Sequence, residues 1–135
     1  MIIHVNPLLH FLLYWFWHPL KTSDALYEIT YAIGSSGKLI LAFDGWKIVG
    51  ALNYYYKSDN TIRVAHLGSR KKGMGRALLD EVKKFNKVIT LYCVDHNVAF
   101  YEKCGFRLLN KELGGNIMIL CERRHGGSRL AVNED

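Results

Sequence analysis

A short basic turn with two glycines, residues 70–75, is the segment of this sequence best suited to chemistry. It follows an apolar run that ends at 67–69 and precedes an amphipathic stretch that begins at Met74. A helix N-terminus presents backbone N–H groups without intrahelical partners and a partial positive charge. Gly73 and Gly75 allow that backbone to approach a bulky anion closely. Four cations surround the glycines: Arg70, Lys71, Lys72 and Arg76. The turn therefore predicts a phosphate-binding site.

Two common nucleotide-binding loops do not fit this turn. A Walker A loop needs Gly-Lys followed by Ser or Thr, whereas Gly75 is followed by Arg76 and Ala77. A dinucleotide fingerprint needs a third glycine where Leu78 stands. What remains is a basic residue, two spacers and Gly-x-Gly before a helix, a pattern that ordinary helix starts share. The turn alone therefore identifies no cofactor.

A second motif lies downstream, at 97–106, and reads Asn-Val-Ala-Phe-Tyr-Glu-Lys-Cys-Gly-Phe. The two motifs, with a buried strand expected between them, resemble those of the GCN5-related N-acetyltransferase (GNAT) superfamily. The first motif of that family is matched at Arg70, Lys72, Gly73 and Gly75. The second, Asn-x-x-Ala-x-x-Phe-Tyr-x-x-x-Gly-Phe, is matched at Asn97, Tyr101, Gly105 and Phe106. The chain departs from the pattern where Lys71 replaces a usual glycine, where the segment before the turn is shorter, and where Ala99, Phe100 and Tyr101 are contiguous.

The resemblance implies an α+β fold with a mixed, mostly antiparallel sheet flanked by helices, as in acyl-CoA N-acyltransferases. It implies an enzyme that moves the acetyl group of acetyl-CoA, its co-substrate, directly to a primary amine without a metal. In the family the pyrophosphate binds the glycine turn, and the pantetheine arm enters between two splayed parallel strands, where backbone amides hold the thioester oxygen. The implied donor-binding positions are Leu67, Gly68, Arg70, Lys71, Lys72, Gly73, Met74, Gly75, Arg76 and Asn97.

Two residues are candidates for proton transfer. Tyr101 matches the family position of the general acid for the coenzyme A thiolate, and a phenol with an ordinary pKa near 10 keeps its proton at neutral pH. Its alternative role is to pack the helix on the sheet. The expected strand over 61–67 has no carboxylate, so His66 is its only candidate base, with a purely structural role as the alternative. Asn97 is expected to bind the cofactor, to cap a helix, or both.

The acceptor remains open between a small molecule and a protein. Asp24 and Glu28, on an expected helix, would suit an amine, although exposed helix residues are usually only solvated. Tyr54 and Tyr56 could line an acceptor pocket. A homodimer also remains open.

Hydrophobic periodicity and turn residues predict the elements that hold these motifs. The expected strands are 1–5, 38–43, 46–56, 61–67, 87–94, 106–113 and 117–121. The expected helices are a buried one with Asn6 as its N-cap and Pro7 at its first position, and helices over 24–33, 74–86 and 97–103. Thr22, Ser23 and Asp24 can cap the helix over 24–33. Gly105 can end the last helix in the left-handed conformation. The strand, turn, helix and strand over 61–94 predict two parallel neighbours crossed by a helix.

The basic charge gathers around the turn. The net charge is +6, and residues 57–87 alone hold nine Lys or Arg against three Asp or Glu. Such a field favours a polyanion, either a phosphorylated cofactor or nucleic acid. Lys83, Lys84 and Lys87 could instead be the solvated face of a helix. A nucleic-acid-binding or nucleic-acid-modifying role is therefore the alternative to the enzyme, and a catalytically silent interaction module is a third.

Length and composition predict one globular domain over 1–122, with a disordered tail over 123–135. The uncharged run over 2–20 contains two prolines and no cleavage signal, so we expect neither a membrane span nor a signal peptide. Cys93 and Cys121 lie in apolar runs and predict reduced thiols in the cytoplasm. We expect no metal site, because Cys93, His96 and Cys104 lack a fourth ligand at a familiar spacing.

Overall fold

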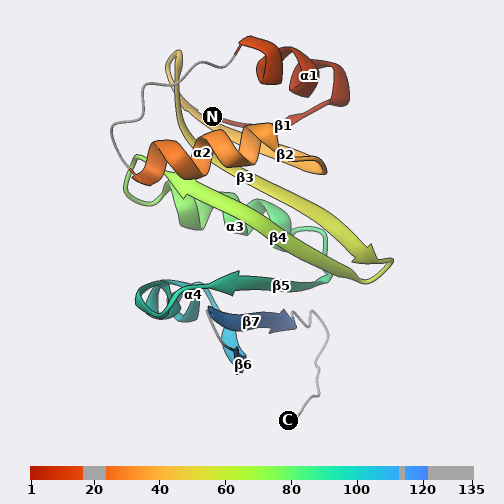
Figure 1. Ribbon diagram of the computed structural model, residues 1–135, viewed down its shortest axis with the longest axis vertical. Helices are drawn as coiled ribbons and strands as arrows, with labels where there is room; N and C mark the ends of the chain where they lie inside the picture. Colours follow the sequence, from red (N-terminus) through yellow and green to blue (C-terminus); the bar gives the residue numbers. More distant parts are fainter. Residues whose placement is uncertain (17–23, 113–114, 122–135) are drawn as a thin grey trace.

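One seven-stranded sheet organises the protein in the computed structural model, which describes residues 1–16, 24–112 and 115–121 (Figure 1). The strand order is β1-β2-β3-β4-β5-β7-β6. The strands are β1 (Ile2–Val5), β2 (Lys38–Asp44), β3 (Lys47–Ser58), β4 (Thr61–Ser69), β5 (Val88–Cys93), β6 (Arg107–Glu112) and β7 (Gly115–Cys121). The helices are α1 (Pro7–Phe16), α2 (Asp24–Gly34), α3 (Met74–Lys83) and α4 (Val98–Lys103), with a 3-10 turn at Asp95–Asn97 before α4. The predicted α+β fold is confirmed.

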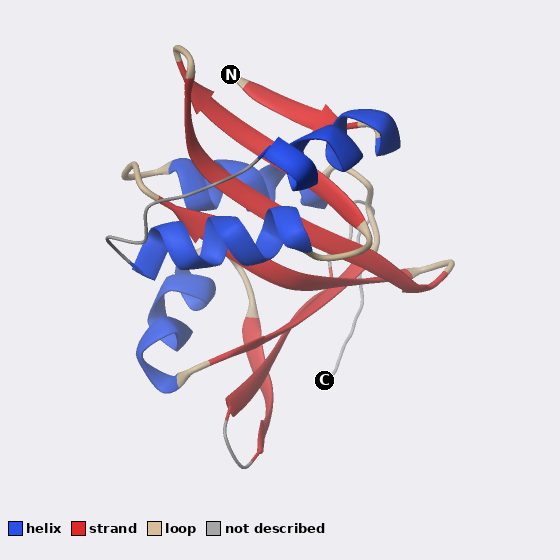
Figure 2. Ribbon diagram, turned by 45° about the horizontal axis from the view of Figure 1, so that its top comes forward, coloured by secondary structure: helices blue, strands red, loops and turns tan. Residues whose placement is uncertain are grey.

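Helices cover both faces of the sheet, with α2 on one face and α3 on the other (Figure 2). Alternation along β2 serves both layers, because Leu39 and Leu41 join the cluster under α2 while Ile40 and Ala42 join the cluster under α3. Burial of each large apolar side chain contributes about 1.5–3 kcal/mol to folding. The sheet is thus a rigid platform between two apolar layers.

The predicted parallel pair is confirmed, and its pairing is short. β4 and β5 are the one parallel pair among the described strands, joined from Thr61–Val88 to Val64–Leu91. β4 then continues to Ser69 along β3, and β5 continues to Cys93 along β7. Figure 1 shows the two strands diverging toward their C-terminal ends. The carboxyl ends of β4 and β5 therefore enclose a wedge-shaped gap.

The first helix begins where the sequence predicts, but it is not buried. The Asn6 side chain accepts a hydrogen bond from the Leu9 N–H at 2.8 Å, so the predicted cap of α1 is confirmed. Leu8 and Phe11 are 70% and 58% exposed, however. α1 lies beside the edge strand β1, where only one side of the helix meets α2, and Leu13 packs there against the apolar cluster. The expectation of a buried helix was wrong because an edge position offers one partner only.

Two further expectations concern chain ends and membranes. The tail over 123–135 lies outside the described residues, as do Thr22 and Ser23, which were expected to cap α2. Among the helices described, none is long and apolar enough to cross a bilayer.

The core packing leads to a stability prediction. Leu78 is fully buried in α3, and a Cβ added at Gly50 of β3 would lie only 3.0 Å from its Cδ1 atom. We expect Leu78→Ala to lower the free energy of unfolding by about 2–5 kcal/mol, because a cavity is left behind. Leu109→Ala, at an exposed position of β6, makes the same chemical change and should stay within about 0.5 kcal/mol. Urea unfolding of both variants tests this, and equal losses would contradict the assigned core.

Candidate active site

The glycine turn forms one wall of a cavity of about 680 Å³. The opposite wall comes from α4 and the residue before it. The lining residues are Leu67, Ser69, Arg70, Lys71, Lys72, Gly73, Gly75, Asn97, Phe100 and Tyr101. The structure thus brings most of the predicted donor-binding residues to one cavity. Gly68, Met74 and Arg76 are not in its lining, and His66 lies in a neighbouring cavity.

Free backbone N–H groups converge at the start of α3. Gly73 stands at the N-cap with a left-handed φ of 87° and no side-chain cap. Two neighbouring amides are already used, since the Arg70 N–H donates to Val49 at 2.7 Å and the Met74 N–H donates to Lys71 at 3.1 Å. Within the described part of the chain, no hydrogen bond occupies the amides of Lys72, Gly73, Gly75 and Arg76. These four donors at a positive helix end can bind an anion.

The two glycines serve the turn in different ways. Gly73 faces open space, so its importance lies in its left-handed backbone, which L side chains rarely adopt. A Cβ at Gly75 would lie 3.3 Å from the Phe100 ring. Gly75 therefore lets α4 approach the start of α3 and close the cavity, a reason that the local sequence pattern does not reveal.

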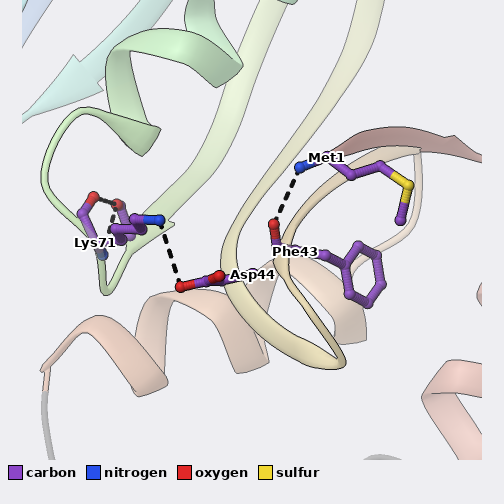
Figure 3. Close-up of polar contacts among 5 residues, drawn as sticks. Met1, Phe43, Asp44 and Lys71 are labelled. Carbon is purple, nitrogen blue, oxygen red and sulfur yellow. Dashed lines mark hydrogen bonds and ion pairs between the residues drawn. The ribbon is translucent and has the colours of Figure 1, made fainter.

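Lys71 is held away from the free amides by the hairpin between β2 and β3. Its Nζ atom lies 3.3 Å from an Asp44 carboxylate oxygen, as Figure 3 shows. Its carbonyl oxygen accepts a hydrogen bond of 2.8 Å from the Ser69 hydroxyl. The Lys71 side chain thus fastens the turn to the hairpin, which leaves Arg70 and Lys72 as the cations in the cavity lining with no ion pair among the described residues.

The later lysines of the basic segment are engaged elsewhere. The Lys83 ammonium donates to the Cys104 carbonyl and pairs with Asp80 at 3.5 Å. Lys84 pairs with Glu81 at 2.7 Å, and the Lys84 and His4 hydrogen bonds lower the pKa of the Glu81 carboxyl. The anion-binding surface is accordingly narrower than the charge count of the sequence suggests.

A second cavity, of about 280 Å³, occupies the gap between β4 and β5. Its lining residues are Glu28, Val64, Ala65, His66, Leu67, Leu91, Tyr92, Cys93, Val94, Asn97 and Tyr101. Leu67, Asn97 and Tyr101 line both cavities. The two cavities therefore meet at these three residues. The free amides of the glycine turn line the first cavity, and the Glu28 carboxylate and the His66 imidazole line the second.

Tyr101 packs the core and also reaches the junction. It is 8% exposed, and its ring packs edge-on against Phe100 and Phe106 at centroid distances of 5.0 and 5.8 Å. Burial raises the pKa of Tyr101 well above its ordinary value, with smaller contributions from Cys93, Cys104 and Glu28. The phenol therefore keeps its proton over the whole physiological range.

Asn97 does not cap α4 with its side chain. It occupies the N-cap position, but makes no side-chain cap hydrogen bond there. A side-chain amide in the lining of both cavities is then open to a ligand. The cofactor-binding expectation for Asn97 remains a prediction, and its expected place at the helix N-cap is confirmed, although its side chain makes no capping hydrogen bond.

His66 has a partner that the sequence did not identify. Its Nδ1 atom lies 3.9 Å from a Glu28 carboxylate oxygen, and its ring stacks on Tyr31 with centroids 5.8 Å apart. Glu28 belongs to α2 and His66 to β4, so no local spacing relates them. The helical pattern over 24–33 could only have placed Glu28 on some exposed face.

Two other side chains near the site, Tyr54 and Cys93, are buried. Tyr54 packs on Phe85 with ring centroids 5.8 Å apart, in the layer under α3. Neither Tyr54 nor Tyr56 lines the two cavities that meet at Tyr101, so a role of these tyrosines in an acceptor pocket stays a prediction. Cys93 lines the gap, but burial and the charge of Asp95 raise the pKa of its thiol.

The left-handed turn at Gly73 can be tested against a matched glycine. We expect Gly73→Ala to destabilise the fold by about 1–2 kcal/mol, because an L residue is strained at positive φ. Gly34→Ala, at the end of α2, meets no atom within 4 Å and has no positive φ. It should be neutral or stabilising by up to about 1 kcal/mol. Chemical denaturation compares the two, and equal effects would show that the turn tolerates another backbone.

Comparison with known proteins identifies this architecture. A family model described as an acetyltransferase (GNAT) domain matches residues 35–108. That range includes both motifs up to Phe106 and the strands that diverge between them. No curated protein sequence matches the chain.

Solved structures share the fold at low sequence identity. An IAA acetyltransferase from Bacillus cereus is 17% identical, with 89% of this chain and 97% of that chain covered and a TM-score of 0.59. A GNAT family acetyltransferase from Elizabethkingia anophelis, with acetyl-CoA bound, is 16% identical, with 89% and 96% covered and a TM-score of 0.58. PaiA N-acetyltransferase from Thermoplasma acidophilum, in complex with coenzyme A, is 23% identical. That comparison covers 61% of this chain and 58% of the PaiA chain, with a TM-score of 0.55.

Proposed function

This chain belongs to the GNAT family of acetyltransferases, and we propose that it transfers the acetyl group of acetyl-CoA directly to a primary amine. The observation that carries the proposal is the meeting of two cavities at Leu67, Asn97 and Tyr101. One cavity suits a phosphorylated donor and the other a basic acceptor. Structural neighbours solved with coenzyme A or acetyl-CoA support the same donor for this chain.

The donor site fits a coenzyme A thioester in three respects. Four free amides and the cations Arg70 and Lys72 suit its pyrophosphate. The gap beyond Val64 and Leu91 leaves backbone groups of β4 and β5 unpaired, and the amides of the pantetheine arm can pair with them as an added strand would. Leu67, at the junction, then lies beside the thioester carbonyl. An acceptor in the second cavity would approach that carbonyl from the Glu28 side.

Direct transfer is favoured over an acetylated cysteine. A nucleophilic cysteine needs a depressed thiol pKa, whereas burial raises that of Cys93, the cysteine in the gap. The amine must lose a proton, and His66 is the proposed base because it is the imidazole beside the junction. The departing thiolate must gain one, and Tyr101 is the proposed general acid. Reduced Cys93 and Cys104 suit the cytoplasmic location that we also propose.

Donor binding is the first test of this function. We expect acetyl-CoA to bind with measurable heat in isothermal titration calorimetry and to raise the melting temperature. Moderate salt should weaken it only modestly, because the contacts include neutral amides as well as ion pairs. Nucleic acid held by its phosphates would instead lose affinity steeply between about 50 and 200 mM salt. An absence of both heat and thermal shift with acetyl-CoA would overturn the enzyme and favour a silent interaction module.

Tyr101→Phe tests the general acid. It removes one oxygen and keeps the ring packing, so we expect kcat to fall at least about tenfold with little change in stability or acetyl-CoA affinity. Tyr55→Phe, on an exposed ring of β3 outside both cavities, is the matched control and should keep full turnover. Free thiol release with a good amine acceptor is the assay. Equal turnover in the two variants would leave Tyr101 with a packing role only.

A further inference from the structure

We propose that Glu28 and His66 form the ammonium-binding site of the acceptor, and that the acceptor is an alkyl primary amine with no acidic group near the reacting nitrogen. The inference rests on the proposed function, because it assigns the substrate class of the same site. It concerns residues from α2 and β4 that only the fold brings together.

The spacing of the two side chains fits a bound nitrogen. The Glu28 oxygen and His66 Nδ1 lie 3.9 Å apart, which is too long for a direct hydrogen bond. A nitrogen placed about 2.8 Å from each atom completes a triangle, at the usual length of a charge-assisted hydrogen bond. Half of the Glu28 side chain is exposed, so a ligand can reach it without rearrangement of the helix.

The charge of the cavity selects against acidic acceptors. Among the residues that the structure describes, Glu28 is the only one in the lining with a formal charge, apart from His66 when protonated. No Lys or Arg of this described part lines the cavity to pair with a carboxylate or phosphate of the acceptor. A second anion beside Glu28 would be unpaired in a partly buried site, which costs binding free energy.

The walls offer polar as well as apolar contacts to the chain behind the ammonium. Leu67 and Val94 are apolar, whereas Tyr92, Asn97 and Tyr101 bring polar groups to the same lining. The Tyr31 ring stacks on the His66 ring, with an angle of 20° between the two rings. A volume of about 280 Å³ admits a slender methylene chain more readily than a bulky branched group.

The same pair can supply the proton chemistry. The ammonium of the acceptor gives one proton to His66, and the resulting imidazolium is stabilised by the Glu28 carboxylate. The amine lone pair then forms the C–N bond with the thioester carbon while the C–S bond breaks and its electrons pass to sulfur. Tyr101 protonates that sulfur, and the amide nitrogen gives up its remaining excess proton, which restores the phenol through solvent. Glu28 also contributes to the raised pKa of Tyr101, which agrees with its closeness to the junction.

The test uses the full chain, saturating acetyl-CoA and a panel of amines. We expect unbranched diamines and a lysine-containing peptide to be acetylated, the two together reporting on free and protein-borne alkylammonium groups. Amines of similar length that carry a carboxylate or phosphonate beside the nitrogen should react at least about tenfold more slowly in kcat/KM. Faster reaction of the acidic amines would overturn the assigned class.

Charge removal at Glu28 then tests the residue. Glu28→Gln should raise the KM for a diamine at least tenfold and leave the KM for acetyl-CoA within twofold. Asp59→Asn, in the turn between β3 and β4, removes one exposed carboxylate away from both cavities and should change neither. Glu28→Asp should restore part of the diamine affinity. A Glu28→Gln enzyme with wild-type KM for the diamine would overturn the proposal.

The failure of this inference is distinguishable from that of the proposed function. Acetyl-CoA binding by calorimetry depends on the glycine turn and is measured without an acceptor. If the unmodified chain does not bind acetyl-CoA, the proposed enzymatic function is wrong. If acetyl-CoA binds and amines are acetylated with no dependence on Glu28, only the acceptor assignment is wrong. A Glu28→Gln, His66→Gln double variant adds a second readout, because residues that share one ligand should give non-additive losses.

Discussion

The end of hydrogen bonding between β4 and β5 is the constraint on which the rest of this structure depends. The two strands pair only as far as Val64 and Leu91, yet each continues along its other neighbour. β4 stays joined to β3 as far as Ser69, and β5 stays joined to β7 as far as Cys93. The divergence is therefore built into the sheet. An exposed backbone edge inside a folded sheet is costly unless a ligand or water satisfies it.

Hydrogen bonds to neighbouring elements hold the strand ends on both sides of the gap. On the β5 side, the buried Asn116 amide donates to the Cys93 carbonyl at 3.2 Å and to Asp95 at 2.8 Å. The hydrogen bond from Asn116 to Asp95, together with that of the Lys111 ammonium, lowers the pKa of the Asp95 carboxyl. On the β4 side, the Arg70 amide donates to Val49 of β3. These hydrogen bonds hold the glycine turn and α4 on the two sides of the gap. The Phe100 ring of α4 lies against Gly75 at the start of α3, and it also packs on the ring of Tyr101.

The sequence predicted what local geometry controls. The left-handed Gly105, with a φ of 99°, and the Asn6 cap follow from neighbours within a few positions, and the crossover over 61–94 follows from the order of consecutive elements. Burial of α1 was mispredicted, because apolar composition does not reveal that a helix lies beside an edge strand. The Lys71 contact with Asp44 could not be predicted, since it depends on how the hairpin folds back over the turn. Glu28 beside His66 is of the same kind.

This division follows from the chemistry of the two halves of the site. An anion cradle made of consecutive backbone amides needs a contiguous turn, so its residues are adjacent in the chain and its sequence signature is strong. The second cavity, which we propose binds the acceptor, uses side chains from α2, β4, β5 and α4, which lie outside the glycine turn. Under this proposal, specificity for the acceptor can vary while donor recognition stays constant. The second cavity must accordingly be interpreted from three-dimensional placement, where a carboxylate and an imidazole brought together from α2 and β4 carry more information than any motif.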